Sequence, residues 1–167
     1  MTIIIGYNDK KNKEIILASD RQATRGKEPI HNVTKIFSKK LEIVDDKKQI
    51  IETKTLWFGH TGLATNSNYL KYAFELPQKN VNESIEKYLI KKLIKEFNEE
   101  LIENNLVKVK ESMIKADDWF LVIIDNKIYK ISCNLGVVDK VIKAIKCVNT
   151  YDIYCNDNYD IKKIPYN

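Results

Sequence analysis

Strands and helices are predicted in blocks along this chain, and not in alternation. Apolar runs predict strands at residues 2–7, 14–19, 35–44, 50–58, 118–125, 127–132, 152–155 and 161–164. Helical spacing of apolar residues predicts helices at residues 66–76 and 137–148. It also predicts a longer helix, whose apolar residues run from 85 to 101. Folds built from βαβ units need a helix after nearly every strand, so this order excludes them. It predicts the α+β class, with sheets packed on each other and helices grouped outside them.

The chain opens on a nearly unbroken apolar run that contains three consecutive isoleucines. Such a run, at residues 2–7, is typical of a strand buried on both faces. The polar segment 8–13 predicts a turn, and the run at residues 14–19 completes a hairpin. The chain therefore begins inside a sheet. Residues 21–33 predict a loop, because they include a glycine and a proline.

The longest predicted helix carries one apolar stripe with a period of four residues. The stripe consists of Ile85, Leu89, Leu93, Phe97 and Leu101. Asn80 is the predicted cap of this helix, with Glu83 three positions later. Lysines and glutamates are interspersed over residues 82–104, which predicts a solvated face and not a phosphate-binding stripe.

The composition indicates one globular domain over residues 1–167, with 44% hydrophobic and 31% charged residues, which excludes a disordered chain. The net charge of +5 is not clustered, so no nucleic-acid interface is expected. No apolar run is long enough to span a membrane, and no signal peptide follows Met1, so we expect a cytoplasmic location. Cys133, Cys147 and Cys155 lack metal-ligand spacing and are predicted to be buried thiols.

The common motifs of nucleotide-binding, serine-hydrolase and zinc-peptidase sites are absent from the sequence. A Ser or Cys triad would need His31 or His60, and such histidines are more often structural. Thr2 offers a nucleophile that works without histidine. Once Met1 is removed, the Thr2 hydroxyl and a free α-amine lie on one residue. An α-amine has an ordinary pKa of roughly 7.7–8.0, which suits a general base.

The residues around Thr2 resemble the proteasome β-subunit superfamily, and most closely its HslV-type branch. The resemblance rests on the segments TIIIG at residues 2–6, IILASDRQATRG at 15–26, NVTKIF at 32–37, WFGHTG at 57–62 and DIYCN at 152–156. In that family an N-terminal Thr opens the first strand, an acidic residue ends the second, and a Lys follows in a further strand of the K-[IVL]-F type. Thr2, Asp20 and Lys35 fill these positions here.

The resemblance implies an N-terminal-nucleophile hydrolase with a four-layer α/β/β/α sandwich. It implies that Lys35 lowers the pKa of the Thr2 groups by like-charge repulsion and that Asp20 orients Lys35, where the alternative is an ordinary ion pair. It assigns the Gly59 N–H to the oxyanion hole, where the alternative is a tight turn. It requires no metal and no organic cofactor.

The resemblance also implies where a peptide substrate lies. Thr24, Gly59 and Thr61 match positions that pair with an extended substrate as an added strand. Trp57 matches the pocket for the residue before the scissile bond, which predicts a preference for a small side chain. Core packing is the alternative role for Trp57.

The sequence departs from the family at two places. The usual Ser-Gly motif is replaced by Ser132-Cys133-Asn134, so Ser132 is carried over as a supporting catalytic residue without its glycine. The C-terminal helical layer is shortened, and Thr150 stands near the position of the family's supporting Asp. These departures weaken the expected catalytic machinery and the contacts between subunits.

We therefore expect a threonine peptidase acting on peptides or unfolded proteins within a homo-oligomeric ring, with an ATP-dependent unfoldase as a possible partner. One alternative passes the same acyl-enzyme to an amine, as a peptide ligase or transpeptidase does. Another is a catalytically silent assembly subunit that keeps the fold. A retained Met1 would block the amine and the mechanism.

Overall fold

The computed structural model describes residues 4–21, 23–25, 28–30, 33–106, 109–110, 113–114, 119–132, 138–140 and 159–166. In residues 23–25, 28–30, 109–110, 113–114, 132, 138–140 and 159 the backbone alone is described. Thr2, His31, Thr150 and the three cysteines lie outside the described residues.

A three-stranded antiparallel sheet contains the start and the end of the described chain. Its order is β1 (Ile4–Asp9), β2 (Glu14–Asp20), β13 (Tyr159–Pro165). The predicted N-terminal hairpin is confirmed, since Ile4 pairs with Ser19. The prediction that β1 is buried on both faces is wrong at Tyr7, which is 50% exposed, whereas Gly6 on the opposite face is buried.

A six-stranded sheet forms the second layer. Its order is β12 (Val138–Lys140), β11 (Lys127–Ser132), β10 (Trp119–Ile124), β6 (Ile50–Thr61), β5 (Ile36–Val44), β7 (Lys79–Asn80). All pairs are antiparallel except β5 with β7. β6 continues through Gly59 to Thr61, although the predicted strand ends at residue 58, because β5 and β10 both pair with β6 at Gly59.

The helices differ from their predicted bounds. α1 is Ala64–Tyr72, and the long helix consists of α2 (Ile85–Tyr88), a π-helical segment η1 (Leu89–Ile94) and α3 (Lys95–Glu103). A stripe with a period of four would rotate around a regular helix of 3.6 residues per turn. The wider π turns compensate for this rotation, and all five residues of the predicted stripe are buried.

The cap of the long helix is Ser84, not Asn80. The Ser84 hydroxyl accepts a hydrogen bond from the Lys87 N–H at 3.2 Å, whereas Asn80 belongs to β7 and donates to Asp46. The chain between β7 and the helix forms a turn, so the helix begins four residues later than the capping pattern at Asn80 suggests.

Replacing Ser84 with alanine should lower the free energy of unfolding by about 1 kcal/mol, because an N–H in the first helical turn loses its partner. Urea denaturation of the two proteins would measure this difference. The variant Ser84→Thr keeps the hydroxyl and is expected to stay close to the parent, so an equal loss in both variants would contradict the capping role.

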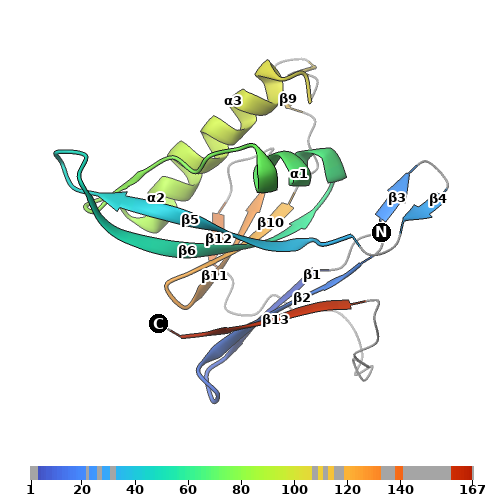
Figure 1. Ribbon diagram of the computed structural model, residues 1–167, viewed down its shortest axis with the longest axis horizontal. Coiled ribbons are helices and arrows are strands. Elements are labelled where there is room, and N and C mark those ends of the chain that lie inside the picture. Colours follow the sequence, from blue (N-terminus) through green and yellow to red (C-terminus); the bar gives the residue numbers. More distant parts are fainter. Residues whose placement is uncertain are drawn as a thin grey trace.

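The described elements stack as helices, six-stranded sheet and three-stranded sheet (Figure 1). One core lies between the sheets and contains Ile15, Leu17, Ile36, Leu121, Ile123 and Ile128. A larger core lies between the six-stranded sheet and the helices, where Phe58, Phe97 and Phe120 are almost fully buried. The α+β class is confirmed. A fourth, helical layer would have to come from chain outside the described residues.

Three further segments differ from prediction or lie beyond description. The predicted loop at residues 21–33 contains a small hairpin of β3 (Ala23–Arg25) and β4 (Glu28–Ile30). β8 (Val109–Lys110) and β9 (Met113–Ile114) form another. The helix predicted at residues 137–148 does not begin as expected, because Val138–Lys140 pairs with β11 as a strand. The rest of that segment and the predicted strand 152–155 lie outside the described residues.

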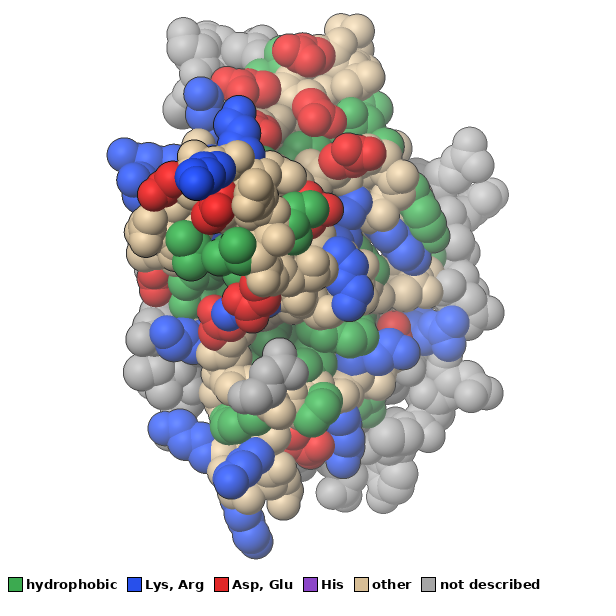
Figure 2. Space-filling model, turned by 60° about the vertical axis from the view of Figure 1, so that its left-hand side comes forward, with side chains coloured by type: hydrophobic (Ala, Val, Ile, Leu, Met, Phe, Trp, Pro, Cys, Tyr) green, Lys and Arg blue, Asp and Glu red, His purple; other side chains and the backbone are tan. Residues whose placement is uncertain are grey.

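Charged side chains of both signs are interspersed over the face drawn in Figure 2. In the described part of the chain, no helix is long and apolar enough to span a bilayer.

Candidate active site

A buried ion pair joins the two sheets at one end of the sandwich. The Lys35 Nζ atom donates to the Asp20 Oδ2 atom at 2.7 Å, and the two side chains are only 7% and 15% exposed. Asp20 is the last residue of β2, and Lys35 directly precedes β5. Charges so far from water are costly unless each has a partner, so the pair fixes these two strand ends against each other.

The first described residue of β1 packs against the same place. Ile4 lies opposite Ser19, the neighbour of Asp20. A Cβ atom placed on Gly59 would lie only 2.8 Å from the Ile4 Cγ2 atom, so the absence of a side chain at Gly59 lets β1 approach β6. Lys35, Gly59 and the start of β1 therefore meet at one end of the molecule.

The Gly59 N–H belongs to the sheet. The His60 N–H donates to the Lys35 carbonyl oxygen at 3.1 Å, so His60 directs its backbone groups toward β5. Adjacent residues of an antiparallel strand direct these groups to opposite neighbours, so the Gly59 N–H faces β10, where Gly59 pairs with Leu121. In this arrangement its N–H is committed to the ladder.

Gly62, for which the sequence predicts no separate role, lies between the end of β6 and the start of α1. It is exposed and has a φ of 138°, a conformation that other residues rarely adopt. The N-cap of α1, Leu63, makes no side-chain capping bond. Gly62 is the last residue of the family-like segment WFGHTG and precedes the predicted helical region. That position is the sequence signal that could have identified Gly62.

The sheet register brings Thr61 and Ser132 toward the end that holds the ion pair. Thr61 pairs with Trp119, and Trp119 pairs with Ser132, so the two predicted residues are separated by two strand spacings of about 4.8 Å each. Thr24 lies in β3, opposite Pro29. The backbone alone is described at Thr24 and Ser132, so no contact of their side chains follows.

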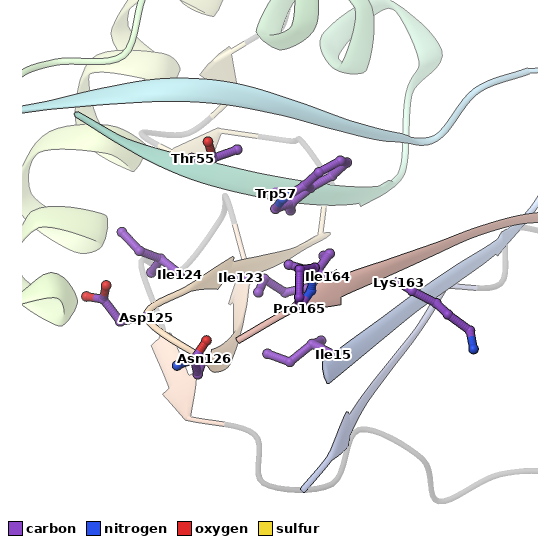
Figure 3. A pocket seen from close by; sticks show the side chains of 10 residues that line it. All are labelled: Ile15, Thr55, Trp57, Ile123, Ile124, Asp125, Asn126, Lys163, Ile164 and Pro165. Atoms are coloured by element: carbon purple, nitrogen blue, oxygen red, sulfur yellow. The ribbon is translucent and has the colours of Figure 1, made fainter. Parts of the chain in front are cut away.

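Trp57 lies between the two sheets, away from the ion pair. Its partly buried side chain packs against the inter-sheet core and lines a cavity of about 200 Å³. The cavity is bordered by Ile15 and Ile164, at the opposite end of β2 from Asp20 (Figure 3). This position favours core packing over the substrate pocket that the resemblance implies for Trp57.

His60 is 3% exposed, and its ring lies 4.8 Å from the ring of Phe120. Its position in the packed interior fits the structural role expected for it. Among the described residues, no group of three or more His, Cys, Asp and Glu side chains forms a metal site.

Solved structures share this fold. HslV from Trypanosoma brucei aligns with a TM-score of 0.54 and 12% identity, over 99% of this chain and 100% of that chain. BPH from Thiobacillus denitrificans aligns with a TM-score of 0.55 and 16% identity, over 86% and 69%. A second structure of BPH from Thiobacillus denitrificans, in complex with epoxomicin, aligns with a TM-score of 0.54 and 17% identity, over 86% of this chain and 69% of that chain. No protein-family model and no curated protein sequence matches the chain.

These likenesses confirm the proteasome-like, HslV-type fold that the sequence resemblance implies. They extend over nearly the whole chain in the case of HslV. At 12–17% identity they establish the fold alone.

Proposed function

We propose that this chain is a threonine-type peptidase, a single domain over residues 1–167, whose nucleophile is the Thr2 Oγ atom after removal of Met1. The observation that carries the proposal is the buried Lys35–Asp20 pair beside the start of β1. Thr2 precedes Ile4 by two residues, and Ile4 packs on Gly59 at this end of the sandwich. A lysine held by a carboxylate is the electrostatic partner that an N-terminal threonine needs.

The proposed reaction proceeds through an acyl-enzyme. The Thr2 amine takes the hydroxyl proton through a bridging water as the Oγ atom attacks the peptide carbonyl carbon. The ammonium of Lys35 stabilises the developing negative charge, and Asp20 fixes its direction. The proton passes to the departing amine, and water then hydrolyses the ester and restores Thr2.

We assign the oxyanion donor to the backbone at Gly62 in place of Gly59. The Gly59 N–H faces β10, whereas Gly62 lies after the last ladder pair of β6 and before the N-cap of α1, so its N–H belongs to neither the ladder nor the helix. Ser132 and Thr61 approach the same end through the register and remain candidates for supporting the site and for pairing with substrate.

The proposal includes the finer architecture and assembly. The helical spacing of Val141, Ile142, Ile145 and Val148 makes this segment the candidate for the fourth layer. We propose that copies of the chain assemble into a ring that encloses the sites, with peptides or unfolded proteins as substrates and an ATP-dependent unfoldase as partner.

The proposal is tested on untagged protein made in its native host. Intact mass should show that Met1 is absent, and epoxomicin, the compound bound to BPH in one of the comparison structures, should add one molecule per chain at Thr2. The Thr2→Ala variant, which keeps a small second residue, should not be labelled.

Two outcomes would favour the alternatives. A chain that lacks Met1 and still resists labelling would favour the silent assembly subunit. Incorporation of a labelled peptide amine into the product, in competition with water, would favour the ligase or transpeptidase.

A further inference from the structure

One row of residues across the three-stranded sheet is polar at the end that holds the ion pair. Ile4 pairs with Ser19, and Ser19 pairs with Asp160 on the neighbouring strand β13. Paired residues of antiparallel strands direct their side chains to the same face of a sheet. The Ile4 side chain lies where a Cβ atom on Gly59 would clash, so this face is the one toward the six-stranded sheet. The Ser19 and Asp160 side chains therefore point into the space between the two sheets.

The polar groups of this row lack close partners in the described part of the chain. Ser19 is 2% exposed, and its Oγ atom has no hydrogen-bond partner. The Asp160 side chain is 17% exposed, and the Lys162 Nζ atom lies 3.8 Å from its Oδ1 atom, beyond hydrogen-bond distance. The Lys162 side chain is itself 46% exposed, so this contact contributes little. A mostly buried carboxylate and hydroxyl without close partners indicate that another group completes this place.

The other described cations at this end of the sandwich do not supply that group. The Lys35 Nζ atom is bound to the Asp20 carboxylate at 2.7 Å. Arg21 follows Asp20 in the chain, but its buried Nε atom makes no hydrogen bond. Asp160 is therefore the mostly buried carboxylate that still needs a donor here, and the proposed mechanism gives it no role.

Removal of Met1 creates a suitable donor. It converts the Thr2 nitrogen from an amide with one N–H into an ammonium with three N–H donors and a positive charge. Thr2 precedes Ile4 by two residues, which span at most about 7 Å. Ser19 lies directly opposite Ile4, between Ile4 and Asp160. A hydroxyl in this position can accept from the amine while it donates to the carboxylate.

We propose that Asp160, acting through the Ser19 hydroxyl, is a positioning residue that holds the Thr2 α-amine in place for its role as general base. The inference rests on the proposed peptidase function. Neither Asp160 nor Ser19 takes part in the bond-breaking steps. The Asp160 carboxylate directs the amine as the Asp20 carboxylate directs Lys35.

The test follows epoxomicin labelling of Thr2 by intact mass from about pH 5 to 9, across the ordinary pKa of an α-amine. The labelling rate should rise as the amine loses its proton and then reach a plateau. In Asp160→Asn the plateau should fall about 10-fold, because the amine is no longer held in place. The midpoint should move down by about 0.5–1 pH unit, because a nearby carboxylate favours the charged amine and raises its pKa. Asp20, Lys35 and Lys162 are unchanged in this variant, so the difference reports Asp160.

Ser19→Ala is the second variant. It removes a hydroxyl that has no described partner, so the fold should persist even if Asp160→Asn does not fold. The plateau should fall to a similar extent, because the bridge is lost. The midpoint should move less than in Asp160→Asn, because the charge remains. Thermal unfolding of each variant shows whether the fold persists.

Glu14→Gln is the matched control. Glu14 lies at the other end of β2 from the ion pair, its side chain is 20% exposed, and the Lys163 Nζ atom lies 3.6 Å from its Oε1 atom. The change removes one carboxylate of similar exposure, with a similarly loose lysine contact, from the same sheet. Both the plateau and the midpoint of the parent protein should be retained.

Two results would overturn the inference. An unchanged plateau and midpoint in folded Asp160→Asn, or in Ser19→Ala, would remove the positioning role and leave the peptidase function intact. A lower plateau with an unmoved midpoint in Asp160→Asn would indicate a structural role only. Absence of labelling in a parent chain that lacks Met1 would instead refute the proposed function, and the inference with it.

Discussion

Replacing Lys35 with methionine should slow epoxomicin labelling of Thr2 by about 10²- to 10³-fold, the usual effect of losing one group that stabilises developing charge. Methionine keeps the length of the side chain and removes the ammonium. The same change leaves the Asp20 carboxylate, 15% exposed, without the cation now 2.7 Å away. It should therefore also lower the free energy of unfolding by about 3 kcal/mol. Intact mass over time and urea denaturation measure the two effects.

Asp20→Asn in the same background separates catalysis from stability. The variant with both changes leaves neither charge buried, so it should recover much of the lost unfolding free energy. Labelling should remain as slow as in Lys35→Met, because the ammonium is still absent. Recovery of labelling together with stability would show that the pair is an ordinary structural ion pair, the alternative that the sequence leaves open.

The hairpins and the long helix were predictable because their signals are local. Apolar runs flank the turn at residues 45–48 and the turn at Asp125 and Asn126. They predict strands independently of the rest of the chain. The helix cap was misplaced because Asn80 fits a capping pattern, but it pairs in parallel with β5 through a contact 36 residues away. Tertiary pairing overrode the local preference.

The ion pair at the site was predictable only through the family-like motifs, since nothing in the spacing of Asp20 and Lys35 alone requires contact. The direction of the Gly59 N–H could not be predicted from the sequence, because it depends on which neighbouring strand each residue of β6 faces.

Gly59→Ala should slow Thr2 labelling by about 10²-fold, although alanine keeps the backbone N–H. The new Cβ atom would lie 2.8 Å from the Ile4 Cγ2 atom and 3.3 Å from the Leu17 Cδ1 atom. The Ile4 methyl is attached at Cβ and cannot swing away freely, so the start of β1 must shift. A displacement of about 1 Å can cost this much in rate, and overpacking should cost about 1–3 kcal/mol of unfolding free energy.

Gly6→Ala is the matched control, because Gly6 also lies between the sheets but on the far side of Ile4 from the chain start. Its Cβ atom would lie 3.3 Å from the Ile128 Cγ2 and Leu121 Cδ1 atoms, a milder overlap with side-chain methyl groups. Labelling should fall much less than in Gly59→Ala. Adding Ile4→Ala to Gly59→Ala removes the clashing methyl and should restore part of the rate. If that double variant were no faster, the loss could not come from displacement of β1, and the link between the Gly59 contact and the reactivity of Thr2 would fail.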